Sequence, residues 1–80
     1  MKYVTLENRI CAVDNDKVIG EIDFEKINDN TYNIYRTFVL EEYRGKNIAS
    51  ELVNRAFDEL RNNRNANIES TCSYCSKFID

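Results

Sequence analysis

The segment Arg44-Gly45-Lys46-Asn47-Ile48-Ala49 lies where a β-rich stretch gives way to the long amphipathic pattern of the chain, so it marks the start of a helix. The first N–H groups of a helix have no partner inside it, and together with the positive end of the helix dipole they bind anions. Gly45 permits a close backbone approach, while Arg44 and Lys46 add positive charge. The segment can therefore hold a phosphate or pyrophosphate. An ordinary turn with a surface Arg and Lys explains the same residues equally well.

A second group of reactive residues, Cys72, Tyr74 and Cys75, follows the last predicted strand. Cys72 is either a small buried thiol or a thiol activated by the N-terminus of a following helix. The Cys-x-x-Cys spacing also suits a dithiol redox pair, which would form a reversible disulfide. A zinc site is not predicted, because the chain has no second cysteine pair and no His.

Composition limits the classes of function that this chain can have. Its 80 residues form one domain, 1–80, with a small core. The net charge of −3 and the lack of a Lys/Arg run argue against nucleic-acid binding. No apolar leader and no stretch of 18 apolar residues occur, so neither export nor a membrane span is predicted. Three cysteines suit reduced thiols, and we expect a cytoplasmic protein of undetermined oligomeric state.

Three strands are expected before the anion-binding segment: Arg9–Val13, Val18–Ile27 and Thr31–Val39, with Met1–Leu6 as a short leading extension. Asn- and Asp-rich turns separate them, which predicts an antiparallel meander. The second strand alternates as a half-buried strand does. Its two faces carry Val18, Gly20, Ile22 and Phe24 on one side and Glu21, Asp23 and Glu25 on the other.

After the anion-binding segment the hydrophobic period changes from two to about 3.6, which indicates a helix packed on the sheet. Its apolar rows are Ile48, Leu52, Ala56 and Leu60, and Ala49, Val53 and Phe57. The helix should end within Asn62–Asn65, because Asn tolerates a left-handed cap. Ala66–Thr71 is then a fourth strand, followed by a short helix over Ser73–Ile79.

A strand, a helix and a strand in sequence predict a right-handed crossover, with Thr31–Val39 and Ala66–Thr71 parallel. The fold class is therefore α/β (α+β). We expect the ends of both strands and the helix start, at Val39-Leu40, Thr71-Cys72 and Asn47-Ile48, to meet at one edge of the sheet, where such folds bind ligands.

With these residues in view, the sequence resembles a known family. Thr37-Phe38-Val39, then Arg44 to Ala49, then Leu52-Val53, is similar to the acetyl-CoA loop of GNAT-type N-acetyltransferases, whose signature is Gln/Arg-x-x-Gly-x-Gly/Ala. The block Thr71-Cys72-Ser73-Tyr74 resembles that of the small, single-domain YjdJ-like branch. Asn47 stands where the signature has Gly, and Arg36 stands where many relatives of that branch have His.

The resemblance implies an acetyl-CoA-dependent transferase that acetylates an amine, built on a minimal GNAT fold. It implies that the cofactor contacts Phe38, Val39, Leu40, Arg44, Gly45, Lys46, Asn47, Ile48 and Ala49. It also implies that Cys72 is an acetyl acceptor or a wall residue, and that Tyr74 is a candidate proton donor to the departing CoA thiolate. The alternative from another class is a CoA-binding or protein-interaction module without catalysis.

Overall fold

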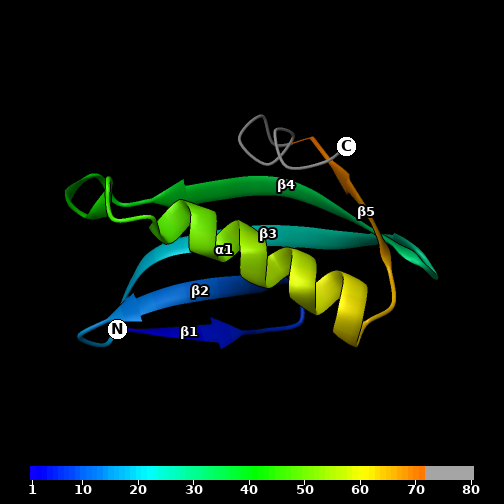
Figure 1. Ribbon diagram of the computed structural model, residues 1–80, viewed down its shortest axis with the longest axis horizontal. Coiled ribbons are helices and arrows are strands. Elements are labelled where there is room, and N and C mark those ends of the chain that lie inside the picture. Colours follow the sequence, from blue (N-terminus) through cyan, green and yellow to red (C-terminus); the bar gives the residue numbers. More distant parts are fainter. Residues whose placement is uncertain (72–80) are drawn as a thin grey trace.

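A computed structural model describes residues 1–71 of the chain (Figure 1). Five strands, one α-helix and two short helical turns follow one another along this part of the chain. In order they are β1 (Lys2–Thr5), β2 (Arg9–Asp14), β3 (Lys17–Asn28), β4 (Thr31–Val39), the 3-10 turn η1 (Glu41–Tyr43), α1 (Ile48–Asp58), the π-helical turn η2 (Glu59–Asn63) and β5 (Asn67–Ser70).

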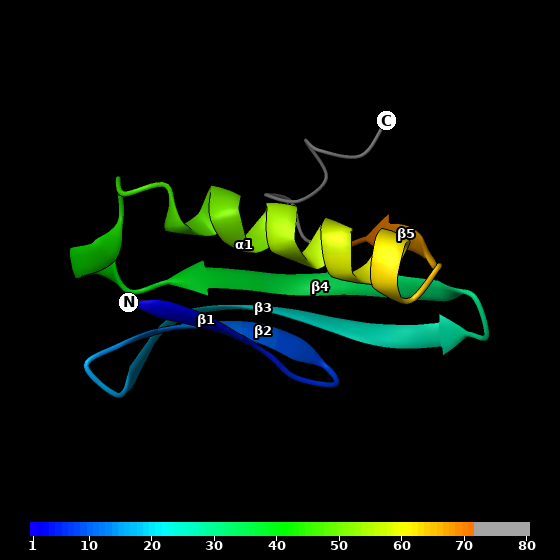
Figure 2. The same ribbon diagram turned by 60° about the horizontal axis from the view of Figure 1, so that its bottom comes forward.

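The strands form one sheet in the order β1-β2-β3-β4-β5, and α1 lies across one face of it (Figures 1 and 2). The first four strands pair antiparallel, and β5 pairs parallel to β4. The predicted mixed fold, with its meander and crossover, is confirmed. The meander has one strand more than expected, because the leading extension Met1–Leu6 supplies β1 instead of remaining irregular.

The core lies between α1 and the sheet. The predicted apolar rows of the helix face inward: Leu52, Ala56 and Leu60 are fully buried, and Ala49 and Phe57 pack partly against the same cluster. Asn65 adopts the left-handed conformation, with φ of +57°, so the helical region ends where an Asn cap was expected. The sequence therefore predicted which face of the helix packs and where it stops.

The assignment of Val18 to the buried face of β3 was wrong. Val18 is 44% exposed, whereas Ile19 is fully buried in the core. The register between β2 and β3 shifts at Ala12 and Val13, so a β-bulge interrupts the alternation that places Val18 with Gly20 and Ile22. At this bulge the strict alternation of exposed and buried side chains along β3 is broken, so Val18 does not share the buried face with Gly20 and Ile22.

The parallel ladder between β4 and β5 also changes the geometry predicted for the sheet edge. Ser70 pairs with Ile34, and the Thr71 N–H donates to the Ile34 carbonyl at 3.0 Å. Val39 lies five residues further along β4, about 16 Å away at the rise of an extended strand. The end of β5 thus lies beside the middle of β4, and it does not meet the helix start at one edge as predicted.

The short helix predicted for Ser73–Ile79 lies outside the described residues. Within residues 1–71, no helix has both the length and the apolar character needed to cross a membrane.

Candidate anion-binding site

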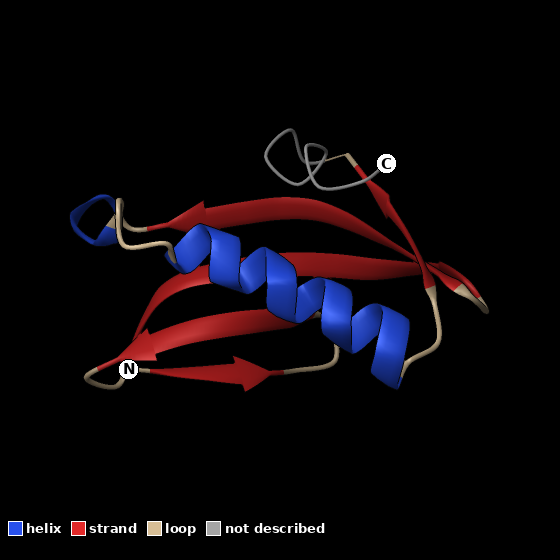
Figure 3. Cartoon of the chain, viewed as in Figure 1, coloured by secondary structure: helices blue, strands red, loops and turns tan. Residues whose placement is uncertain are grey.

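The segment between β4 and α1 forms the candidate site (Figure 3). After Val39, the chain makes the turn η1 and then enters α1 at Ile48. Gly45 and Asn47 both adopt left-handed backbone conformations, with φ of +82° and +63°. Left-handed residues of this kind form concave groups of N–H donors that bind anions. Asn is one of the few non-glycine residues that adopt this conformation routinely, which explains how Asn47 occupies the position of a motif glycine.

The helix start has backbone donors available. The Glu51 N–H donates to the Asn47 carbonyl at 3.0 Å, and the Asn47 side chain makes no capping hydrogen bond. The N–H groups of Ile48, Ala49 and Ser50 precede that bond, and such groups have no partner within the helix. Their directed dipoles favour an anion even though Glu41 and Glu42 lie nearby in sequence.

A cavity of about 200 Å³ lies at this helix start. It is lined by Val39, Tyr43, Arg44, Gly45, Asn47, Ile48, Ala49 and Ser50. Of the predicted cofactor residues, Phe38, Leu40 and Lys46 do not line it. Tyr43 and Ser50 were not predicted. Ser50 could have been found by continuing through the first helical turn, whereas nothing in the sequence singled out Tyr43.

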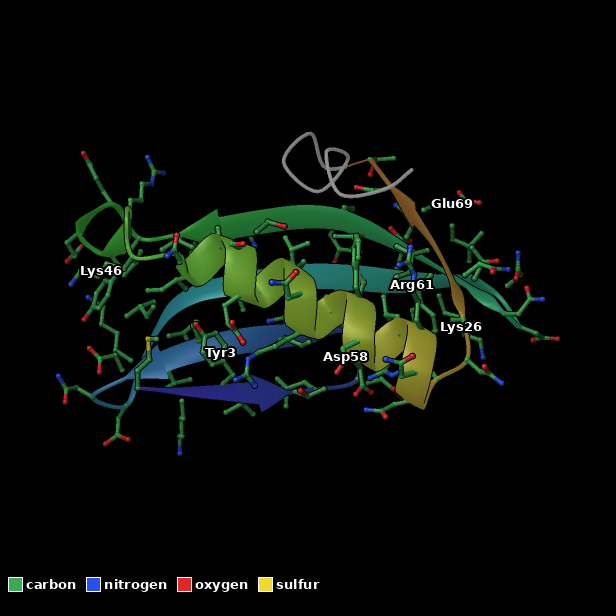
Figure 4. All side chains as sticks on the ribbon, in the orientation of Figure 1. Tyr3, Lys26, Lys46, Asp58, Arg61 and Glu69 are labelled. Atoms are coloured by element: carbon green, nitrogen blue, oxygen red, sulfur yellow. The ribbon has the colours of Figure 1, made fainter. Side chains whose placement is uncertain are left out.

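Contacts around the cavity fix its charged and aromatic side chains. Arg44 Nε donates to the Val39 carbonyl at 3.3 Å, and Lys46 Nζ lies 5.5 Å from the centre of the Tyr43 ring. Lys46 projects at the end of the molecule formed by this turn (Figure 4). The backbone of Leu40 is occupied by the fold, because its N–H donates to Ile19 at 2.8 Å and its carbonyl accepts from Tyr43 at 2.9 Å.

The predicted catalytic residues Cys72 and Tyr74, and with them Cys75, lie outside the described residues. Thr71, the last described residue, is held against β4 by its backbone bond to Ile34 and by the Asn33 side-chain amide, which donates to Thr71 Oγ1 at 3.3 Å.

A second polar cluster lies on the sheet face opposite α1, and sequence reasoning missed it. Glu21 and Asp23 of β3 are 9% and 3% exposed, although their alternation predicted a solvent-facing side. Arg36 Nη1 lies 3.3 Å from Asp23 Oδ2 and 3.5 Å from Glu21 Oε2, and Arg9 Nε lies 3.7 Å from Asp23 Oδ1. Arginines on the two neighbouring strands therefore cover the carboxylates. An acidic pair two residues apart, flanked by Arg on adjacent strands, was the available signal.

Two neighbours complete this cluster. Phe38 pairs with Glu21 in the ladder, and its ring lies 4.6 Å from the Arg36 guanidinium, so the Phe38 side chain faces away from the helix. Cys11 pairs with Glu21 from β2 and is 7% exposed. Burial, followed by the nearby carboxylates, raises the pKa of the Cys11 thiol, which keeps it protonated. Within residues 1–71, no group of three or more His, Cys, Asp or Glu is placed to hold a metal ion.

The acidic pair predicts a specific pH dependence of stability. A hydrogen bond to Asp23, then burial, then the Asp23 charge raise the pKa of Glu21, against the opposing effect of Arg9 and Arg36. The folded chain therefore binds a proton at Glu21 more tightly than the unfolded chain does. This contribution to stability is complete below the ordinary carboxyl pKa of 4.5 and is lost as pH rises through the raised value.

Glu21→Gln removes this titration while keeping the shape of the side chain. We expect the melting temperatures of wild type and variant to be close at pH 4 and to separate as the pH rises to 7, with the variant higher. Thermal melts across that range measure the difference, and Glu25→Gln, an exposed change on the same strand, is the control. A constant difference at every pH would contradict the assignment.

Comparisons with known proteins identify the family and the fold. A family model described as GCN5-related N-acetyl-transferase matches residues 9–80. No curated protein matches the chain. A GCN5-like protein from Staphylococcus aureus, solved by NMR in solution, is similar with a TM-score of 0.74 and 24% identity, over 98% of this chain and 76% of the other.

Two further structures are similar over shorter parts of their own lengths. A GNAT-family acetyltransferase from Streptococcus pneumoniae has a TM-score of 0.69 at 20% identity, over 90% of this chain and 59% of the other. An aminoglycoside acetyltransferase from an uncultured soil metagenomic sample has a TM-score of 0.64 at 19% identity, over 82% of this chain and 48% of the other. At these identities the structures show the shared fold, and the family model covers nearly the whole chain. The chain belongs to the GCN5-related N-acetyltransferase family.

Proposed function

We propose that the chain is an acetyl-CoA-dependent N-acetyltransferase that acetylates an amine of unidentified structure. The observation that carries the proposal is the cavity at the start of α1. There, left-handed backbone at Gly45 and Asn47 precedes helix N–H groups that the Asn47 side chain does not cap. This arrangement fits a pyrophosphate, because directed N–H donors and a helix dipole both stabilise negative charge.

The segment Arg44–Ala49, with Ser50, would hold the pyrophosphate of CoA. The Val39 N–H would hydrogen-bond the pantetheine arm, because the Val39 carbonyl accepts from Arg44 and the Phe38 carbonyl lies against Gly20 of β3. Leu40 would serve as an apolar wall, because its own backbone groups are already paired. Within residues 1–71, the β4–β5 ladder ends at Ile34, so β5 does not cover the last part of β4. An extended ligand can pair with a strand there in the manner of an added strand.

Bound acetyl-CoA would supply an activated thioester. In the transfer, the amine nitrogen would bond to the carbonyl carbon as the carbon–sulfur bond breaks, so that the amine loses one proton and the sulfur gains one. Backbone N–H groups of β4 would stabilise the charge that develops on the carbonyl oxygen. Tyr74 would donate a proton to the leaving thiolate. Cys72 would either accept the acetyl group transiently or form part of the wall.

Calorimetry with acetyl-CoA and with CoA tests the proposal. We expect saturable binding of both ligands at one site per chain. If neither acetyl-CoA nor CoA binds detectably, the proposed acetyltransferase function is wrong.

The role of Cys72 is decided by intact-mass measurement after incubation with acetyl-CoA. An acetyl acceptor gains one acetyl group in the wild type and in Cys75→Ala, and none in Cys72→Ala. An adduct that persists in Cys72→Ala would show that Cys72 is not the nucleophile.

A CoA-binding module without catalysis is the second candidate. The chain spans 59% and 48% of the lengths of two acetyltransferases to which it is similar. CoA binding without acetyl transfer to Cys72 or to any member of a panel of primary amines would support this candidate over the enzyme.

Asn47→Gly is expected to tighten CoA binding by about 3- to 10-fold, because it removes a side chain from the cavity and frees the left-handed backbone from a Cβ. Asn65→Gly is the matched control, since Asn65 is also left-handed but does not line the cavity. Both changes should alter the melting temperature similarly. Equal CoA affinity in the wild type and Asn47→Gly would place the pyrophosphate elsewhere.

A further inference from the structure

A hydrogen bond joins the candidate site to the hairpin between β2 and β3. The Tyr43 hydroxyl donates to Asp14 Oδ2 at 2.9 Å, across 29 positions of sequence. Tyr43 ends the turn η1 and lines the cavity, whereas Asp14 ends β2. The bond therefore connects a turn of little regular structure to the sheet.

Asp14 lies at the start of a tight hairpin turn. Asn15 and Asp16, which follow it, have φ of +51° and +62°, and Asp14 pairs with Lys17 across this two-residue turn. Two consecutive positive φ values define a tight hairpin turn whose twist matches that of the strands. The Met1 ammonium group lies 3.9 Å from Asp14 Oδ1 on the other side of the carboxylate.

Tyr43 sets the course of the residues that follow it. Its N–H donates to the Leu40 carbonyl at 2.9 Å, and the next N–H, that of Arg44, donates to Glu41 at 3.1 Å. Its ring packs partly against the core and lies under the Lys46 ammonium group. The position of this ring thus fixes one wall of the cavity and the start of the segment that leads to Asn47.

We propose that Tyr43 is a positioning residue for the pyrophosphate subsite, and that Asp14 acts through it by holding the hydroxyl against the β2–β3 hairpin. The inference rests on the proposed function for its ligand. It extends that function by assigning two residues outside the sequence motif to the preparation of the turn for binding. The hydrogen bond to Asp14 also raises the pKa of Tyr43, which keeps the phenol protonated as a donor.

The test compares Tyr43→Phe, Asp14→Ala and the double variant with the wild type. Tyr43→Phe keeps the ring and removes only the hydroxyl. We expect a loss of CoA affinity of about 3- to 10-fold in each single variant, the size of the net contribution of one hydrogen bond, and no further loss in the double variant. Affinity for S-acetylpantetheine, which lacks the pyrophosphate, should not change. Tyr3→Phe, on a partly buried tyrosine beneath α1, is the control and should bind CoA as the wild type does (Figure 4).

Each outcome decides the inference. Unchanged CoA affinity in Tyr43→Phe, equal losses for CoA and S-acetylpantetheine, or additive losses in the double variant would overturn it. Amide hydrogen exchange of the free protein separates its failure from that of the proposed function: the positioning role predicts faster exchange at Arg44–Ser50 in Tyr43→Phe, and unchanged exchange in β3. If the wild type binds no CoA, the proposed function fails, and unchanged exchange would show that the hydrogen bond does not position the turn either.

Discussion

Arg64→Ala is expected to lower the free energy of unfolding by about 2–4 kcal/mol, from the loss of several charge-assisted hydrogen bonds and ring contacts. Arg64 is only 18% exposed. Its Nε lies 2.8 Å from Glu59 Oε2, and its two terminal nitrogens donate to the carbonyls of Glu7 and Leu6 at 2.9 and 3.1 Å. One side chain thus fastens the end of the helical region to the connection between β1 and β2.

The same guanidinium lies 5.3 Å from the ring centres of both Phe24 and Tyr32. Removing it leaves the Glu59 carboxylate, which is 19% exposed, without its cation. Because a small domain has only about 5–15 kcal/mol of net stability, a loss of this size should be evident in urea denaturation.

Arg61→Ala is the matched control, because Arg61 is exposed at the same end of the helix (Figure 4). Its guanidinium lies 4.9 Å from the centre of the Phe57 ring. It should cost no more than about 1 kcal/mol. Arg64→Lys keeps the charge but loses the planar fork of donors, so it should fall between the two. If both Ala variants lose the same free energy of unfolding, the additional contacts of Arg64 do not contribute to stability.

Arg64 shows which part of the fold the sequence could not predict. Hydrophobic period and turn chemistry located β4, the inward face of α1 and the Asn cap, because each of these depends on residues close together in the chain. Arg64 was placed only within the Asn-rich stretch that ends the helix. Its bonds to Leu6 and Glu7 depend on tertiary packing that brings together residues more than 50 positions apart.

The buried acids and the bulge have the same origin. A strand period of two assigns Glu21 and Asp23 to one face but does not say whether that face is covered, and the cover comes from Arg9 and Arg36 on neighbouring strands. The bulge that exposes Val18 arises from the register with β2. Pattern alone gives the direction of side chains along a strand, and pairing decides their surroundings.

The candidate site also has features that local sequence predicts and features that depend on tertiary contacts. The start of α1 follows from local sequence, and Arg44–Ala49 was predicted as an anion-binding turn. The left-handed conformations of Gly45 and Asn47 within it were found in the structure. The contribution of Tyr43 depends on Asp14, a residue from a distant hairpin. Thr71 lies beside the middle of β4 because β5 has only four residues and its last residue, Ser70, pairs with Ile34. Sequence pattern does not give this register.

Ser50→Glu is expected to weaken CoA binding by about 30- to 150-fold without destabilising the protein. Ser50 is the third residue of α1 and lines the cavity. A carboxylate in the first turn interacts favourably with the positive end of the helix dipole. The folded variant should therefore be as stable as the wild type or slightly more stable. The same charge about 6 Å from a pyrophosphate costs roughly 2–3 kcal/mol at the effective dielectric of a protein surface.

Ser50→Gln separates charge from bulk, because it adds a side chain of the same length without the negative charge. Calorimetry should show a small loss for Gln and a large loss for Glu, and the gap between them should narrow as salt is added, since ions screen exposed charges. Equal affinities for the two variants would mean that no anion binds at the start of α1. A lower melting temperature for Glu than for Gln would contradict the dipole argument instead, so the two measurements test the ligand and the helix separately.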